Sequence, residues 1–168
     1  MKKAFTLIEL VVAIMILSIL MVFLYKSYAD LNRVNKTYTE AVENLTKKEL
    51  IKKTLYLDLL LAEKESLIIQ NGDKEFDFVS FMTKHSIHRR INPYVSYMVK
   101  NKILYRLESL QQIKSPELNR EIAFDIDKLG SVKKFKLFGT RDNKKEYYLL
   151  DTRFFQNSKM LLKIKVLN

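Results

Sequence analysis

An apolar run near the N-terminus constrains this chain more than any other feature. From Phe5 to Leu24 the only polar side chains are Thr6, Glu9 and Ser18. In an α-helix such a run rises about 30 Å at 1.5 Å per residue, which matches the hydrocarbon thickness of a bilayer. The sequence therefore predicts one membrane-spanning helix close to the N-terminus.

Two ordinary segments share this pattern. A cleaved secretory signal would also begin with Lys2 and Lys3, and Ser27-Tyr28-Ala29 offers a small-x-small cleavage site. The run is, however, longer than the usual signal core of about 7 to 15 residues. In an uncleaved anchor, Glu9 would be incidental, although a carboxylate at the centre of a spanning helix costs about 2.5 to 3.5 kcal/mol. Glu9 therefore predicts a cationic partner.

The residues around this carboxylate resemble a known leader. The sequence Lys2-Lys3-Ala4 followed by Phe5-Thr6-Leu7-Ile8-Glu9 resembles the class III leader and N-methylation motif of type IV pilins and pseudopilins. The resemblance implies that prepilin peptidase cleaves between Ala4 and Phe5, with Ala where the family usually has Gly. It also implies that Phe5 is then N-methylated.

Cleavage would provide the cation that Glu9 requires. The new α-amino group has a reference pKa of about 7.7 to 8.0 and is cationic near neutral pH. Residues 5 and 9 lie one helical turn apart, so Glu9 can meet its own amine or that of a neighbouring subunit during assembly. The resemblance further implies a single-pass protein of the bacterial inner membrane, with its C-terminal domain in the periplasm.

The helix is expected to continue beyond the membrane to about Leu61, because an apolar stripe persists and no Pro or Gly occurs before Gly72. A helical stalk or coiled-coil dimer is the alternative, although the heptad spacing is irregular. The expected divisions are a leader (1–4), a transmembrane helix (5–25), its periplasmic continuation (26–65) and a strand-rich globular domain (66–168).

After the helix the apolar period shifts toward 2, which predicts β-strands. Turn signals separate most of them, including Gly130 and Gly139 with Asp142-Asn143. Residues 109–114 fit a short helix or an irregular crossover. The expected fold class is α+β: a pilin-like long helix packed on an antiparallel sheet that covers its apolar face, Tyr38, Val42, Leu45, Leu55 and Leu59. The expected strands are Ser66–Gln70, Phe76–Met82, Tyr94–Val99, Ile103–Glu108, Ile122–Ile126, Val132–Phe138, Glu146–Asp151 and Met160–Val166.

The kind of pilin follows from weaker signals. The chain has no Cys, and Lys26 stands near the position where many major pilins carry a helix-kinking Pro, so a major pilin is disfavoured. The second half resembles J-type minor pseudopilins of type II secretion at scattered positions. These are Leu55-x-x-Asp58-Leu59, Val95-x-Tyr97, Leu104-x-Arg106 and Val132-x-x-Phe135-x-Leu137.

No pattern predicts an enzyme, a cofactor or a metal. His85 and His88 are the only histidines, and zinc usually takes three or four protein ligands, so we interpret them as solvated loop residues. Asp125 and Asp127 share one strand face but lack a partner at diagnostic spacing, and we interpret them as a solvated face. Oxygen-bearing side chains also alternate at Asn71, Asp73, Glu75 and Asp77, as calcium ligands often do. The Gly and Glu that an EF-hand loop requires are missing, so calcium binding stays possible but has no further support.

Two hypotheses of function remain. The first is a structural subunit of the pseudopilus of a type II secretion system, whose partners are other minor and major pseudopilins, prepilin peptidase, the inner-membrane assembly platform and the membrane. The second is a minor pilin of a type IV pilus or a competence DNA-uptake system. The net charge of +11 permits nucleic acid as a ligand, but no recognised motif supports it. The candidate phosphate contacts are Lys133, Lys134, Lys136, Lys144, Lys145 and Arg89-Arg90.

Overall fold

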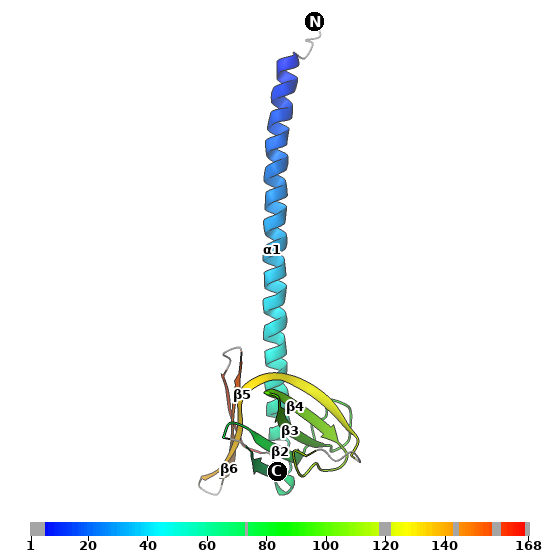
Figure 1. The fold of residues 1–168 in the computed structure, drawn as a ribbon, viewed down its shortest axis with the longest axis vertical. Helices are drawn as coiled ribbons and strands as arrows, with labels where there is room; N and C mark the ends of the chain where they lie inside the picture. The colour runs from blue at the N-terminus through cyan, green and yellow to red at the C-terminus, as the bar shows by residue number, and fades with distance from the viewer. Residues whose placement is uncertain (1–5, 73, 118–121, 143–144, 156–158, 167–168) are drawn as a thin grey trace. The chain divides into compact units, whose positions relative to one another are not determined.

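The computed structural model describes residues 6–72, 74–117, 122–142, 145–155 and 159–166 (Figure 1). Ala4, Phe5, Asp73 and Lys144 lie outside these described residues. The chain divides into two compact units, residues 1–48 and 49–168. One helix, α1, contributes residues to both units.

Helix α1 spans Leu7–Leu60, so the predicted continuation of the helix is confirmed and its end differs from the expected Leu61 by one residue. Its N-terminal part is long and apolar enough to cross a membrane, and none of that apolar window is buried. The hydroxyls of Ser18 and Thr37 donate to the carbonyls four residues earlier. These polar groups are thereby satisfied within the helix itself.

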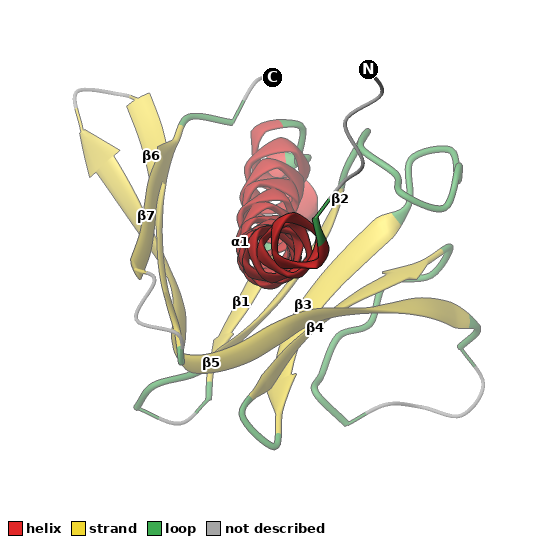
Figure 2. Ribbon diagram, turned by 90° about the horizontal axis from the view of Figure 1, so that it is seen from above, coloured by secondary structure: helices red, strands yellow, loops and turns green. Residues whose placement is uncertain are grey.

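The second unit contains a seven-stranded antiparallel sheet in the order β1-β2-β3-β4-β5-β6-β7, in which each strand pairs with the next along the chain. The sheet curves round the last turns of α1, which belong to the same unit (Figure 2). The predicted α+β fold class, a long N-terminal helix with an antiparallel sheet, is confirmed. The strands are β1 Ile68–Asn71, β2 Asp77–Met82, β3 Tyr94–Lys100, β4 Ile103–Ser109, β5 Phe124–Asp142, β6 Lys145–Phe154 and β7 Lys159–Ile164.

Strand β5 corrects the sequence analysis. The two strands expected on either side of Gly130 are one strand. Its residues up to Ser131 pair with β4, and its residues from Val132 onward pair with β6. Gly130 has φ 137°, a conformation that side chains disfavour, and the register shifts on both sides of it. It therefore bends the strand instead of ending it. Gly139, also expected in a turn, lies inside β5.

The hydrophobic core joins the last turns of α1 to the inner face of the sheet. Leu55 and Leu59 are buried there, whereas Tyr38, Val42 and Leu45 are 69%, 57% and 64% exposed. The expectation that strands cover all five residues was therefore wrong for the first three, which precede the unit that contains the sheet. The sheet side of this core consists of Val79, Phe81, Val95, Tyr97, Leu104, Val132, Phe135, Leu137, Leu150 and Ile164.

The segment after β4 was left open between a helix and a crossover. Described residues 110–117 contain neither helix nor strand, so the irregular crossover is the correct alternative. Ile113 is nevertheless buried against Phe78 and Leu107 in a second, smaller apolar cluster. The crossover is thus anchored by its side chains without regular backbone pairing.

Candidate functional site

A hydrogen-bonded cap lies at the start of α1. The backbone N–H and the hydroxyl of Thr6 each donate to Oε2 of Glu9 at 2.9 Å. The backbone N–H of Glu9 donates in return to Oγ1 of Thr6 at 3.4 Å. This is a capping box, a pattern that the spacing Thr-x-x-Glu already contained and that the sequence analysis missed. Glu9 therefore sets the start of the helix in addition to its predicted assembly role.

A second site lies in the sheet, where the strand register gathers charged residues on one face. Tyr97 of β3 pairs with Arg106 of β4, which in turn pairs with Asp127 of β5. Two positions along, Glu108 pairs with Asp125. Because alternate residues of a strand point to the same side, all five side chains share one face.

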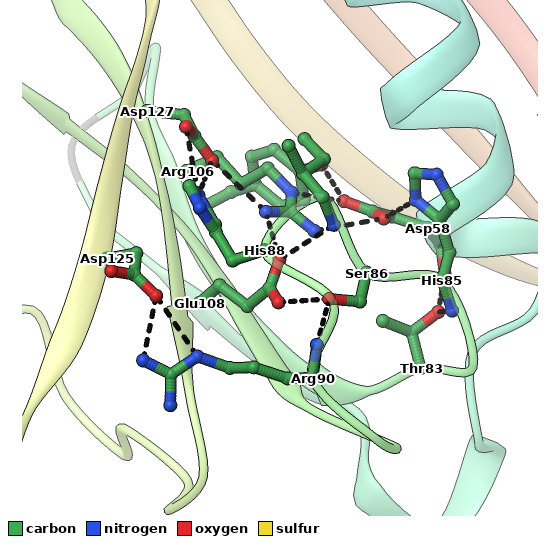
Figure 3. A network of polar contacts seen from close by, with 12 residues as sticks. Asp58, Thr83, His85, Ser86, His88, Arg90, Arg106, Glu108, Asp125 and Asp127 are labelled. Atoms are coloured by element: carbon green, nitrogen blue, oxygen red, sulfur yellow. Dashed lines mark hydrogen bonds and ion pairs between the residues drawn. The ribbon is translucent and has the colours of Figure 1, made fainter.

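Arg106 is the centre of this site, and its guanidinium is completely buried. Nε donates to Oδ2 of Asp58 at 2.7 Å, while Nη1 donates to Glu108 at 2.7 Å and to Asp127 at 3.2 Å. The hydroxyl of Tyr97 donates to the same Asp58 oxygen at 2.5 Å. Asp58 belongs to the last turns of α1, so this buried network ties the helix to three strands (Figure 3).

The environment fixes the protonation of these groups. Burial, followed by the charge of Asp58, raises the pKa of Tyr97 well above its ordinary value, so the phenol stays neutral. Burial opposes the charge on Arg106, but its bonds to Asp58 raise the pKa of the guanidinium. Burial likewise opposes the charge on Glu108, yet hydrogen bonds from Ser86 and Arg106 hold the pKa of its carboxyl below the ordinary range. Arg106 and Glu108 are therefore charged near neutral pH.

Both histidines lie in the loop between β2 and β3 as expected, His88 exposed and His85 half-buried, but each also contacts a carboxylate of the network. Nδ1 of His85 lies 2.5 Å from Oδ1 of Asp58, and Nε2 of His88 lies 3.1 Å from both Asp127 oxygens. A carboxylate only accepts hydrogen bonds, so each of these ring nitrogens carries a hydrogen. Among the described residues no group of three or more His, Cys, Asp or Glu side chains is placed to hold a metal ion.

The two aspartates of β5 also differ from expectation. They share a strand face as predicted, but that face is not simply solvated. Nε and Nη2 of Arg90 donate to one oxygen of Asp125 at 3.0 and 2.7 Å, and this hydrogen bonding lowers the pKa of the carboxyl. Asp127 accepts from His88 and Arg106. Both carboxylates therefore anchor cations.

Several cations suggested as phosphate contacts are already paired. Lys134 donates to Asp151 at 2.8 Å, and Lys136 donates to Asp77 at 3.1 Å. Asp77, one of the possible calcium ligands, also accepts the backbone N–H of Leu137 and is almost fully buried. The structure thus assigns it a role in joining β2 to β5. Lys144 and the side chain of Lys145 lie outside the description.

The sequence analysis missed the network as a unit, although it contained the signal. Arg106 and Glu108 follow Leu104 at alternate positions of a strand, so an inward-facing apolar series continues with charged residues. Charged side chains that face the core must pair with buried groups of opposite charge or with hydrogen-bonding partners. Asp58, Tyr97 and Arg106, which were singled out separately for their resemblance to J-type pseudopilins, prove to be in direct contact.

Comparison with known proteins supports the N-terminal site. Residues 1–25 match the family described as prokaryotic N-terminal methylation motif. Searches of the curated proteins and of the solved structures find no match. A methylation motif on a single apolar N-terminal helix, followed by a curled antiparallel sheet, indicates a type IV pilin-like protein with a class III leader. Proteins of this kind are processed by prepilin peptidase and assemble with other pilins in the membrane.

Proposed function

We propose that this chain is a minor pseudopilin, a non-enzymatic structural subunit in the tip complex of the periplasmic pseudopilus of a type II secretion system. The observation that carries the proposal is the match of residues 1–25 to the methylation motif, directly on a helix able to span a membrane. The globular unit then lies in the periplasm and the chain stays in the inner membrane until assembly.

Glu9 is the assembly charge in this proposal. In the uncleaved chain its carboxylate accepts two hydrogen bonds from Thr6. Cleavage between Ala4 and Phe5 would create an α-amino cation near this capping box, and a carboxylate has lone pairs for further donors. In an apolar environment an ion pair with an amine is far more favourable than an unpaired carboxylate. Glu9 can therefore cap its own helix and bind a cationic N-terminus.

The buried network supports a structural role over a catalytic one. Its central carboxylates, Asp58 and Glu108, are fully buried and accept hydrogen bonds from the buried Arg106. A general acid or base must reach a substrate proton. Groups that are enclosed and mutually neutralised instead fix the orientation of the helix end against the sheet, which suits a subunit that transmits contacts within a filament.

A minor pilin of a type IV pilus or DNA-uptake system is the alternative. It is favoured by Phe155, whose exposed ring has the ammonium groups of Lys102 and Lys133 at 5.9 and 5.5 Å from its centroid. An aromatic ring between cations is a typical element of single-stranded nucleic-acid sites. The pairing of Lys134 and Lys136 with carboxylates reduces the free positive charge nearby, so nucleic acid is the less favoured partner.

The decisive experiment combines processing with phenotype. The full chain is isolated from native membranes of cells with and without prepilin peptidase, and its N-terminus is sequenced. We expect methylated Phe5 only when the peptidase is present. A start at Asp30 would assign the chain to ordinary signal peptidase, and a start at Met1 in both strains would leave a simple anchor.

Deleting the gene should then abolish protein secretion and leave DNA uptake intact, whereas the opposite phenotype would select the alternative.

A further inference from the structure

The loop between β2 and β3, residues 84–92, is unusually well fixed. Its side chains at His85, Ser86, His88 and Arg90 all bind carboxylates of the buried network or of β5. Its backbone is fixed as well, because the N–H of Ile87 donates to Glu108 at 3.1 Å. These contacts hold the loop against the sheet and the last turns of α1 (Figure 3).

Two residues of the loop have positive φ, Arg89 with 61° and Asn92 with 47°. Asn adopts this left-handed region readily, whereas Arg does so rarely, so the backbone strain lies at Arg89. Such strain persists only where the surroundings impose it, and it gathers at positions with a function. Between these two residues stands Ile91, which is 87% exposed and is the most exposed large apolar side chain described in residues 49–168.

The charged side chains of the loop itself are all basic. Lys84 and Arg89 are exposed, and the sequence 84–92 contains neither Asp nor Glu. The carboxylates that the loop contacts on β4 and β5, Glu108 and Asp125, accept hydrogen bonds from the loop and from Arg106. The loop thus presents Ile91 and the half-exposed Ile87 together with the exposed cations Lys84 and Arg89.

We propose that residues 84–92 form a docking knob that inserts Ile91 into an apolar hollow, edged by carboxylates, on the surface of another protein subunit. The choice of a protein partner rests on charge complementarity and on rigidity: a preorganised loop loses little conformational entropy on binding. This inference rests on the proposed assembly function, under which the occupant is a second pilin-like subunit.

The test uses a photo-crosslinking amino acid at position 91 of the full chain in native cells, with the same amino acid at position 161 as control. Leu161 is 53% exposed on β7 and is likewise apolar. We expect a crosslink from position 91 to one subunit, in a peptide where apolar residues adjoin Asp or Glu. In parallel, Arg89→Glu should reduce the crosslink about tenfold or more, while Lys165→Glu should leave it unchanged. Thermal unfolding of both variants must match the wild type.

The outcomes separate this inference from the function on which it rests. Co-purification with sister subunits but equal crosslinking from positions 91 and 161 would overturn the docking knob and leave the assembly function. A specific crosslink to an acidic-rimmed protein that lacks a methylation motif would support the knob and contradict the assembly function. Crosslinking to lipid, or a loss of signal that Lys165→Glu reproduces, would overturn the inference.

Discussion

Replacing Arg106 by Met tests whether the buried network holds the globular unit together. Met has an unbranched apolar side chain and no donor, so the variant removes the hydrogen bonds to Asp58, Glu108 and Asp127 while it still fills the space of the arginine stem. Two carboxylates with fully buried side chains, those of Asp58 and Glu108, then lose their guanidinium. Breaking a buried ion pair from one side costs about 3 to 5 kcal/mol.

This loss is large relative to the stability of one domain, which is about 5 to 15 kcal/mol. Residues 49–168 form the compact unit in question. At about 2.1 cal/mol/K per residue its unfolding entropy is about 0.25 kcal/mol/K, so the melting temperature should fall by about 12 to 20 °C. The measurement is thermal unfolding of the full chain in detergent, followed by near-ultraviolet circular dichroism at pH 7.

Arg153→Met provides the matched control. Arg153 is half exposed and its Nε lies 3.6 Å from Asp151, so its loss should change the free energy of unfolding by less than about 1 kcal/mol. The gap between wild type and Arg106→Met should also narrow toward pH 5, because protonation relieves an unpaired buried carboxylate. Equal effects of the two substitutions, or a gap independent of pH, would refute the reasoning.

Three further predictions concern separate features. The folded protein holds the pKa values of Glu108 and Asp151 below their ordinary 4.5 and 3.8. The stability that these carboxylates contribute is therefore present above those ordinary values and is lost as the pH falls through the folded pKa. The melting temperature of the wild type should drop between pH 5 and pH 2. Gly130→Ala should lower the free energy of unfolding by about 1 to 3 kcal/mol, because φ is 137° there, whereas Gly139→Ala, with no such φ, should change it much less when both are compared in urea titrations. Glu9→Val should leave membrane insertion intact and reduce co-purification with sister subunits, and Glu9→Gln, which keeps a capping side chain without the charge, should show the same defect; normal recovery of the Gln variant would assign Glu9 to capping alone.

The helix was readable from sequence because its signals are local. An apolar run of spanning length, no helix breaker before Gly72 and the Thr-x-x-Glu pattern all act within a few residues of chain. The shift of apolar period also located strands to within a few residues. Gly130 was misread because a glycine allows a reversal as readily as a bend. The pairing of β5 with both β4 and β6 shows that Gly130 bends one strand and does not form a turn between two strands.

The buried network lay beyond local reasoning, because its members come from positions 58, 85, 97, 106, 108 and 127. Each residue alone has a bland interpretation as a surface charge or a loop histidine. Strand register aligns Tyr97, Arg106 and Asp127 in one row, and the last turns of α1 bring Asp58 against that row. Register is a property of paired strands and not of one segment.

The sequence by itself determined the apolar N-terminal helix of membrane-spanning length, the methylation motif and the α+β class, since hydropathy, periodicity and a short motif are written in consecutive residues. The tertiary structure alone decided which charges are buried, which cations are already paired and which loop is held rigid with Ile91 exposed. The physical reason is that the electrostatic role of a side chain depends on its solvation and on partners distant in the chain.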